Sequence, residues 1–553
     1  MGLLRVLGFL LLSIFAIAVV VLIICLGMMT QQETFDQYSL ADDIISLDQN
    51  WPPDVRQQMH FASFGSKLMP YSVFTSLEVA ESEELLSSDI HMQRLGFIPQ
   101  LSATNNPAGL PIGFAVYSED VMQDWVGLTC AACHTSSITY QDSSIVIDGG
   151  PGMLDFLSFE RAISNALNAT LAQAEKFNRL AERLQLESEE DKTMLKLSLQ
   201  ERADFFAKRI AVNQVDVAYG HGRLDAFGRI FNAVTTSAMA IPENKRQPNA
   251  PVSIPMLWDA QHLDLVQWNG SAPNTNPGPL VQNATTVLAV YGEIDMKGKG
   301  MGYPSSIDMV NLGYIQSQYQ GLTSPIWPEH ILGAIDRTRA ARGEEIYRQQ
   351  CLSCHELIDR TDSNRKLRAT LVDIPEIGTD PVMAENFSTR KSYTGYLEGK
   401  RMGVIAGKRF ADEVPTIELV VNATVGSMLD QPLQVIAAFI AEAKSVYSAS
   451  VDFDRKAYKA RSLNGVWATG PFLHNGSIPT LYHMLQKVEL RPEVFYVGNK
   501  EIDPKKVGFI HSEAPFTSKF DTRLYGNSNS GHLFGTDLSE TDKWALVEYL
   551  KTL

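Results

Sequence analysis

Hydrophobic side chains are most concentrated near the amino terminus. Residues 6–29 include no charged side chain and a single hydroxyl group, that of Ser13. About 20 consecutive apolar residues can cross a bilayer as a helix, so this stretch predicts a transmembrane helix. No small-residue cleavage site follows it, and bulky Ile24 precedes Cys25. Both features favour an uncleaved anchor over a signal peptide or a lipoprotein signal.

The charges on either side of this stretch predict its orientation. Arg5 lies on the short amino-terminal side, and acidic residues follow on the other side: Glu33, Asp36, Asp42 and Asp43. Positive charge is retained on the cytoplasmic side of membrane helices. We therefore expect a single-pass protein of the inner (cytoplasmic) membrane whose soluble domain lies in the periplasm.

Further along the chain, amphipathic patterns predict helices. Residues 154–213 carry leucines among Glu, Lys and Arg, with no Gly or Pro between 178 and 213. Residues 331–350 predict a helix that leads directly into Cys351. Residues 538–553 predict a last helix, at whose start Ser539 and Asp542 form a capping box. Residues 240–330 are rich in Pro, Gly and Asn and predict long loops. No strand-rich region is evident, so the expected fold class is mainly α with long irregular loops.

Composition and charge narrow the functional classes. The chain has 553 residues, of which 45% are hydrophobic and 20% charged, as in ordinary globular proteins. Its net charge of -16 argues against nucleic acid as a partner, because nucleic-acid binding requires a basic face. An acidic surface suits a small basic redox partner, and it equally describes an ordinary soluble surface.

Four of the five cysteines fall into two matching pentapeptides, Cys130-Ala131-Ala132-Cys133-His134 and Cys351-Leu352-Ser353-Cys354-His355. Two thiols on one helical turn each form a thioether with a haem vinyl group, and the adjacent imidazole binds the iron. The alternatives are a redox dithiol and half of a zinc site, but zinc needs two further ligands and no cysteine remains outside the apolar stretch. The motifs predict two covalently bound haem c groups, held by Cys130, Cys133, His134, Cys351, Cys354 and His355. Haem attachment of this kind takes place outside the cytoplasm in bacteria, which agrees with the orientation read from the charges.

The sixth ligand of each iron decides what the iron can do. A second His or a Met gives an electron-transferring iron, whereas an open position allows reaction with peroxide or dioxygen. For the second haem, His532 and His474 both lie in tight polar loops, and a role in hydrogen bonding competes with ligation for each. For the first haem the nearby candidates are Met122, Met153 and His221. None lies in a context that requires ligation, so an open distal side is expected there. The acid–base candidates beside it are Glu160, Asp225 and His221, and the catalytic residues stay unknown.

Several longer stretches carry a resemblance to a known family. The chain resembles the bacterial di-haem cytochrome c peroxidase superfamily and, within it, the RoxA-like branch named for a rubber oxygenase. The matching stretches are residues 106–114, 127–134, 147–151, 222–226, 251–270, 342–355, 377–380, 465–482 and 526–536.

The resemblance implies a fold and a set of iron ligands. It implies two cytochrome c-like domains facing each other, one haem each, with His134 and His355 as proximal ligands. His532 best matches the distal ligand of a bis-histidine second haem, and His474 resembles a loop histidine near the haem edge. The domains expected are a membrane anchor at 1–30, a linker at 31–60, a first haem domain at 61–327 and a second at 328–553.

The chain departs from the family pattern at several places. Val488 stands where the peroxidases proper have a Met ligand, so a His/Met second haem is not expected. No Trp occurs between His134 and Trp258, although peroxidases place one soon after the first motif. Trp258 and Trp268 match aromatic positions near or between the haems. A rubber oxygenase must be released to reach its polymer, so its activity does not carry over to a tethered chain. Some di-haem peroxidases hold calcium between domains, and no acidic loop here identifies such a site.

The expected function is that of a peroxidase-like oxidoreductase. Electrons pass from the carboxy-terminal haem to an amino-terminal haem that reacts with peroxide, dioxygen or a small organic substrate. The donor expected is a small periplasmic protein or a membrane component. Two alternatives stay open: a non-catalytic electron-transfer cytochrome with both haems six-coordinate, and a haem dioxygenase of an apolar substrate.

Overall fold

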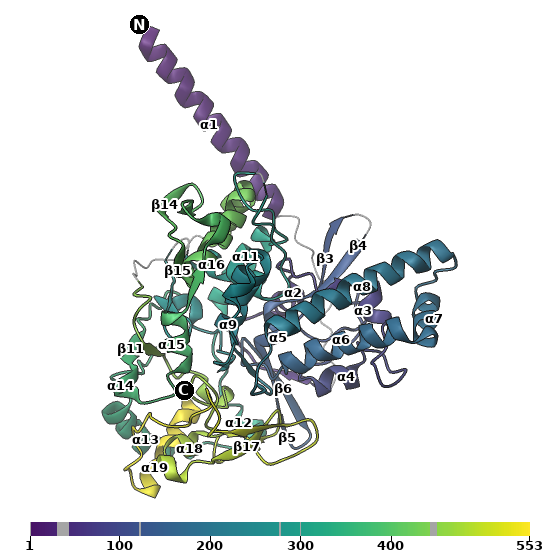
Figure 1. Ribbon diagram of the computed structural model, residues 1–553. Coiled ribbons are helices and arrows are strands. Elements are labelled where there is room, and N and C mark those ends of the chain that lie inside the picture. The colour runs from purple at the N-terminus through teal and green to yellow at the C-terminus, as the bar shows by residue number, and fades with distance from the viewer. Residues whose placement is uncertain (1, 30–43, 121–122, 276–277, 299, 443–450) are drawn as a thin grey trace.

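The computed structural model describes residues 2–29, 44–120, 123–275, 278–298, 300–442 and 451–553 (Figure 1). Within these ranges the chain forms nineteen α-helices and twenty mostly short strands. The prediction of a mainly α fold without a strand-rich region is therefore wrong, because strands occur along much of the described chain. The strands were missed because most have two to four residues, too few for an alternating pattern to emerge from the sequence.

The predicted transmembrane helix is also contradicted, and with it the single-pass localisation in the inner membrane. Nowhere in the described ranges does a helix combine the length and the apolarity that crossing a bilayer requires. The apolar stretch forms helix α1 (Gly2–Met29). Its carboxy-terminal end packs on protein instead. Cys25 is fully buried, and its thiol donates to the Leu433 carbonyl of α17 (Pro432–Glu442) over 3.5 Å.

The first haem motif lies between two small sheets. Strands β2 (Met69–Pro70), β4 (Gln123–Leu128) and β3 (Phe114–Asp120) form one sheet in that order. Strands β1 (Ile44–Ser46), β6 (Ser143–Asp148) and β5 (Thr135–Tyr140) form the other. The one-turn helix α5 (Cys130–Cys133) connects β4 to β5, and α2 (Pro53–Phe61) packs against it. The motif is thus fixed by strands on both sides.

Three helices confirm the pattern read over residues 154–213: α6 (Phe156–Ala172), α7 (Ala174–Arg183) and α8 (Glu189–Val212). They form the arm at one side of the molecule in Figure 1. Asp155 caps α6 by accepting from Ser158 N, and Ser188 caps α8 by accepting from Asp191 N. α6 and α8 pack on each other through the apolar cluster that also contains Phe114 and Phe159.

A second group of helices comes partly from before and partly from after the second haem motif in the chain. It contains α9 (Ala226–Phe231), α10 (Gly278–Ala289), α11 (Met309–Gly321), α15 (Val382–Thr389) and α16 (Thr416–Asp430). Helices α10, α11, α16 and α17 pack on one another. Strands β11 (Thr370–Asp373) and β16 (Ala457–Ala460) follow the second motif in the chain and pair with each other, and β16 ends directly before Arg461.

The second motif follows α13 (Arg337–Gln350), which crosses the last helix, α19 (Glu540–Thr552). The predicted helix at 331–350 is divided, because α12 (Glu329–Leu332) ends at Gly333 and Asp336 caps a new start at α13. The capping box of the last helix is confirmed, since Ser539 Oγ accepts from Asp542 N. Between these helices lie α18 (Leu481–Met484) and the strand pair β17 (Val494–Val497) and β20 (Ser518–Asp521). One buried apolar cluster runs from Leu47 to Leu553, so both motifs share a core.

Candidate haem-attachment sites

The first motif forms a single helical turn. Thr129 caps it by accepting a hydrogen bond from Ala131 N, and His134 N donates to Cys130 O over 2.9 Å. Cys130 and Cys133 are half-buried and not joined by a disulfide. Their burial raises the pKa of each thiol to about 12. A redox dithiol needs a lowered thiol pKa, so these cysteines are unsuited to thiol–disulfide exchange.

His134 has one ring nitrogen engaged and one left for a metal. Its Nδ1 lies 2.9 Å from the Pro255 carbonyl oxygen, and because a carbonyl only accepts, Nδ1 carries the proton. Burial lowers the pKa of His134 to about 4, so the ring is neutral at physiological pH. A neutral imidazole whose Nδ1 donates to a carbonyl presents Nε2 as a ligand, the usual arrangement at metal sites.

The second motif repeats this arrangement at the end of α13. Cys351 N donates to Tyr347 O over 2.8 Å, and His355 N donates to Cys351 O over 2.9 Å. The Tyr347 hydroxyl closes the turn by donating to His355 O over 2.7 Å. His355 Nδ1 donates to the Arg461 carbonyl over 2.7 Å, and burial lowers the pKa of His355. Both motif histidines therefore keep Nε2 available.

A second imidazole faces His355 from the loop before α19. The ring centres of His355 and His532 are 6.2 Å apart, at an interplanar angle of 51°. His532 has a left-handed backbone (φ 47°), and its amide donates to Ile377 O over 2.9 Å. Arg491 fixes the same loop by donating to the carbonyls of Gly531 and His532. Burial lowers the pKa of His532 to about 4, so this ring is neutral as well.

His474 lies in a different environment. Its buried ring stacks on Tyr458, with ring centres 3.8 Å apart and an interplanar angle of 21°. Its carbonyl accepts from Ser253 N, which joins its loop to β8 (Val252–Ser253). The structure therefore brings His532, and not His474, into ring contact with His355.

The candidates named for the distal side of the first haem fall into three groups. Met122 lies outside the described residues. Met153 is buried in the main apolar cluster. His221 has both ring nitrogens within hydrogen-bonding distance of partners, since Nδ1 lies 2.8 Å from Ser518 Oγ and Nε2 lies 3.4 Å from Arg94 O. None of these contacts indicates a ligand role.

The acidic candidates are bound to other groups. Glu160 is buried between Arg229 and Arg209, with contacts of 2.6 Å to each. Burial opposes its ionisation, but the charges of the two arginines outweigh this and lower the pKa of Glu160. Asp225 caps α9 by accepting from Gly228 N, and burial raises its pKa to about 6. Glu160 therefore carries a structural ion cluster, and Asp225 a helix cap.

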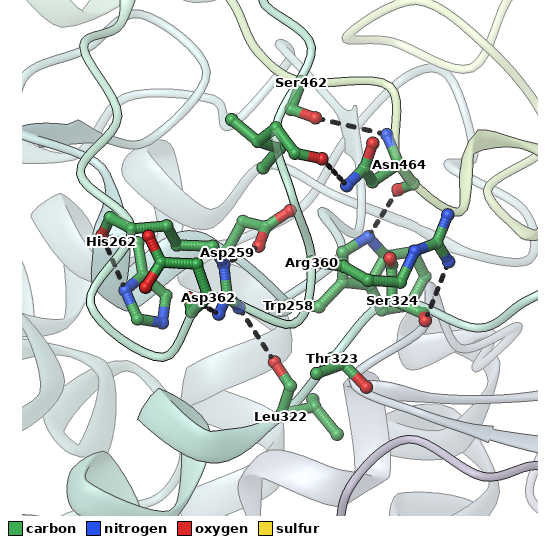
Figure 2. A network of polar contacts seen from close by, with 12 residues as sticks. Trp258, Asp259, His262, Leu322, Thr323, Ser324, Arg360, Asp362, Ser462 and Asn464 are labelled. Atoms are coloured by element: carbon green, nitrogen blue, oxygen red, sulfur yellow. Dashed lines mark hydrogen bonds and ion pairs between the residues drawn. The ribbon is translucent and has the colours of Figure 1, made fainter.

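Trp258 and Trp268 match family positions near or between the haems, and the sequence did not indicate which of them lies there. Trp258 is fully buried, and its indole N–H donates to Asn464 O over 2.8 Å, as Figure 2 shows. Trp268 donates instead to Ser253 O over 2.9 Å. Trp258 therefore connects the segment after Pro255 to the segment after Arg461, the two residues whose carbonyls accept from the motif histidines. Neither Pro255 nor Arg461 was identified from the sequence, because no local pattern marks a residue whose backbone oxygen is used.

A zinc site receives no support from the side-chain arrangement. Across the described ranges, His, Cys, Asp and Glu side chains do not converge in groups of three or more as a metal cage requires. Each motif instead has two thiols on one turn and a histidine that is tied to a distant carbonyl. The donor set therefore fits covalent haem attachment.

Comparison with known proteins supports a haem protein at the carboxy-terminal end. A family model described as RoxA-like, cytochrome c-like, matches residues 457–496. That segment contains Arg461 and His474. Because the match is confined to this region, a cytochrome c-like domain is shown near the carboxy terminus alone, and the prediction of two such domains is corrected accordingly.

Two curated relatives come from Sinorhizobium fredii. The uncharacterized protein y4iJ is 31% identical over 594 aligned positions, which cover 93% of this chain and 94% of that protein. The uncharacterized protein y4iM is 27% identical and covers 56% of this chain and 67% of its own length. The chain belongs to the same family as y4iJ, and its RoxA-like cytochrome c-like domain implies a c-type haem and a haem-binding oxidoreductase.

Proposed function

We propose that the chain is an oxidoreductase that binds two c-type haems, passes electrons from the His355 site to the His134 site, and reacts with peroxide or dioxygen at the latter. In this proposal the chain is related to the di-haem cytochrome c peroxidase superfamily. The residues that would hold the haems are the two cysteines and the histidine of each motif, with His532 as a further ligand at the His355 site. A small electron-donor protein would supply the electrons, and the net charge of -16 favours a basic one.

The observation that carries the proposal is the spacing of His355 and His532. With metal–nitrogen bonds of about 2.0 Å and about 1.1 Å from each nitrogen to its ring centre, two imidazoles on opposite sides of one iron have centres about 6.2 Å apart. The ring centres of His355 and His532 are 6.2 Å apart. His532 Nδ1 is buried without a hydrogen-bond partner among the described residues. No hydrogen bond to the described part of the protein therefore competes with a ligand role for this ring.

The two sites differ in how the chain surrounds them. A haem iron supplies one-electron redox chemistry and, where its sixth position is open, reaction with peroxide or dioxygen. At His355 a second imidazole is already in place, which favours electron transfer. At His134, two of the residues considered as a second ligand are described: His221 is engaged elsewhere and Met153 is packed in the core. The proposal therefore assigns substrate chemistry to the His134 site.

The first experiment counts haems and determines their spin state. The protein is produced in a host that attaches c-type haem, and the haem-to-chain ratio is measured by pyridine haemochrome absorbance and intact mass. We expect two haems per chain, one low-spin and one high-spin, with cyanide altering the high-spin signal only. A single haem per chain, or two low-spin haems that ignore cyanide, contradicts the proposal.

The second experiment separates the two histidines considered for the distal position. In His532→Ala, the low-spin signal of the second haem should be lost and the haem content should stay at two. His474→Ala is the matched control, because it removes another loop imidazole that stacks on Tyr458 instead of facing His355. If His474→Ala abolishes the low-spin signal and His532→Ala does not, the ligand assignment is wrong.

A further inference from the structure

The two motif histidines are bound to two segments that lie side by side. His134 Nδ1 donates to Pro255 O, and His355 Nδ1 donates to Arg461 O. Each segment continues for three more residues, to 258 and to 464. We call residues 255–258 and 461–464 together the histidine bridge.

Two hydrogen bonds join the segments of the histidine bridge. The Arg461 guanidinium Nη2 donates to Met256 O over 3.0 Å, one residue after the carbonyl that holds His134. In the other direction, Trp258 Nε1 donates to Asn464 O over 2.8 Å (Figure 2). Asn464 is fixed in turn, since its side-chain amide donates to Ile358 O, three residues after His355. A displacement of either segment therefore acts on both histidines.

Arg461 contributes to both ends. Its backbone oxygen accepts from His355, and its side chain holds the loop that accepts from His134. The guanidinium is half-buried, and among the described residues no carboxylate lies within ion-pair distance of it. The nearby Asp259 is bound at 2.7 Å to Arg365. Burial lowers the pKa of Arg461 to about 10, so its positive charge is kept at neutral pH.

We propose that Arg461 is a positioning residue shared by the two haem sites, one that orients both proximal histidines and places a positive charge in the histidine bridge. The inference rests on the proposed function, because it requires a haem at each motif. A positive charge near an iron favours its reduced form, which carries one positive charge fewer. Loss of the Arg461 side chain is therefore expected to lower the reduction potentials of both haems.

The test compares Arg461→Gln with Arg390→Gln in the full-length protein carrying its haems. Arg390 is a matched control: it is half-buried, it donates to Asn232 Oδ1 and Asn244 O, and burial lowers its pKa to about 10 as well. Both potentials are measured by titration with dithionite, which gives one electron to each haem, and haem content is checked by pyridine haemochrome. We expect both potentials to fall in Arg461→Gln and to stay unchanged in Arg390→Gln, with two haems per chain in each.

The outcomes distinguish the inference from the proposed function. If Arg461→Gln retains two haems and one potential or neither moves, the shared role of Arg461 is refuted. If the unmodified protein holds fewer than two haems, the proposed function fails first. If Arg461→Gln loses its haems, the inference is tested by a measurement on the unmodified protein instead. Cyanide binding at the His134 site is expected to shift the electron paramagnetic resonance signal of the His355 haem through the histidine bridge, and an unchanged signal overturns the inference.

Discussion

Substituting Gly343 tests the helix crossing that carries the second motif. Gly343 lies in α13, buried against α19. A Cβ added there would lie 2.7 Å from both the Ala545 carbonyl carbon and Tyr549 Cβ, and still closer to the Ala545 oxygen. Carbon atoms in contact prefer about 3.5–4.0 Å, so the helices would have to separate by about 1 Å. Gly343→Ala should therefore loosen α13 just before Cys351.

The expected loss of stability follows from two opposing effects. Overpacking a well-packed contact costs about 1–3 kcal/mol, and the upper end applies because two of the three nearest atoms are backbone. Replacing Gly by Ala within a helix stabilises the helix by about 1 kcal/mol. We expect a net loss of about 2 kcal/mol in the free energy of unfolding. If all 553 residues unfold together, the melting temperature would fall by about 2 °C, so denaturant titration is the more sensitive assay.

The assay follows urea unfolding by circular dichroism at 222 nm and by haem absorbance. Gly321→Ala is the control, because Gly321 ends α11 and nothing lies within 4 Å of the added Cβ. That variant should be unchanged or slightly more stable. If Gly343→Ala is as stable as Gly321→Ala, the helix-propensity gain is unopposed and the close crossing of α13 and α19 is refuted.

Three further outcomes are expected. Glu160→Gln should cost about 3 kcal/mol of stability by leaving Arg229 buried without its charge partner, and equal stability of the variant and unmodified protein in urea would contradict this. For Asp148, burial opposes ionisation, but the bound His60 and Arg56 outweigh it and hold its pKa below the ordinary value. Its contribution is therefore present above about pH 4 and is lost as the pH falls further. Asp148→Asn should reduce the acid-induced loss of stability in unfolding measured as the pH falls from about 5 to about 2, and an unchanged slope would argue against the ion pair. Replacing Cys351 and Cys354 together by Ala should lower the haem-to-chain ratio from two toward one by mass, because either thiol alone could hold the haem; a ratio that stays at two would exclude covalent attachment there.

Residue spacing alone determined the local parts of this protein. Two cysteines and a histidine at fixed spacing are a local pattern, so both pentapeptides could be found without a structure. The capping box of Ser539 and Asp542 is local for the same reason and is confirmed. The helices of residues 154–213 also followed from sequence, since their periodicity persists over many turns.

Apolar content near the amino terminus and the absence of visible strands were misleading for opposite reasons. A hydrophobic stretch does not reveal what it contacts: in α1, Cys25 is buried against α17, whereas large apolar side chains such as Phe15 and Ile17 are exposed. Strands such as β1 or β8 are too short to show a period, and they exist because distant segments pair with them. The residues of a short strand do not indicate which distant segment will pair with it.

Only the tertiary structure decided what surrounds each motif histidine. Pro255 lies 121 positions from His134, and Arg461 lies 106 positions from His355. Both act through backbone carbonyls, which every residue type has, so no side-chain pattern could indicate them. The sequence left His532 and His474 as alternatives because both lie in polar loops. Folding placed one ring 6.2 Å from His355 and stacked the other on Tyr458, since the loop paths are fixed by contacts far apart in the chain.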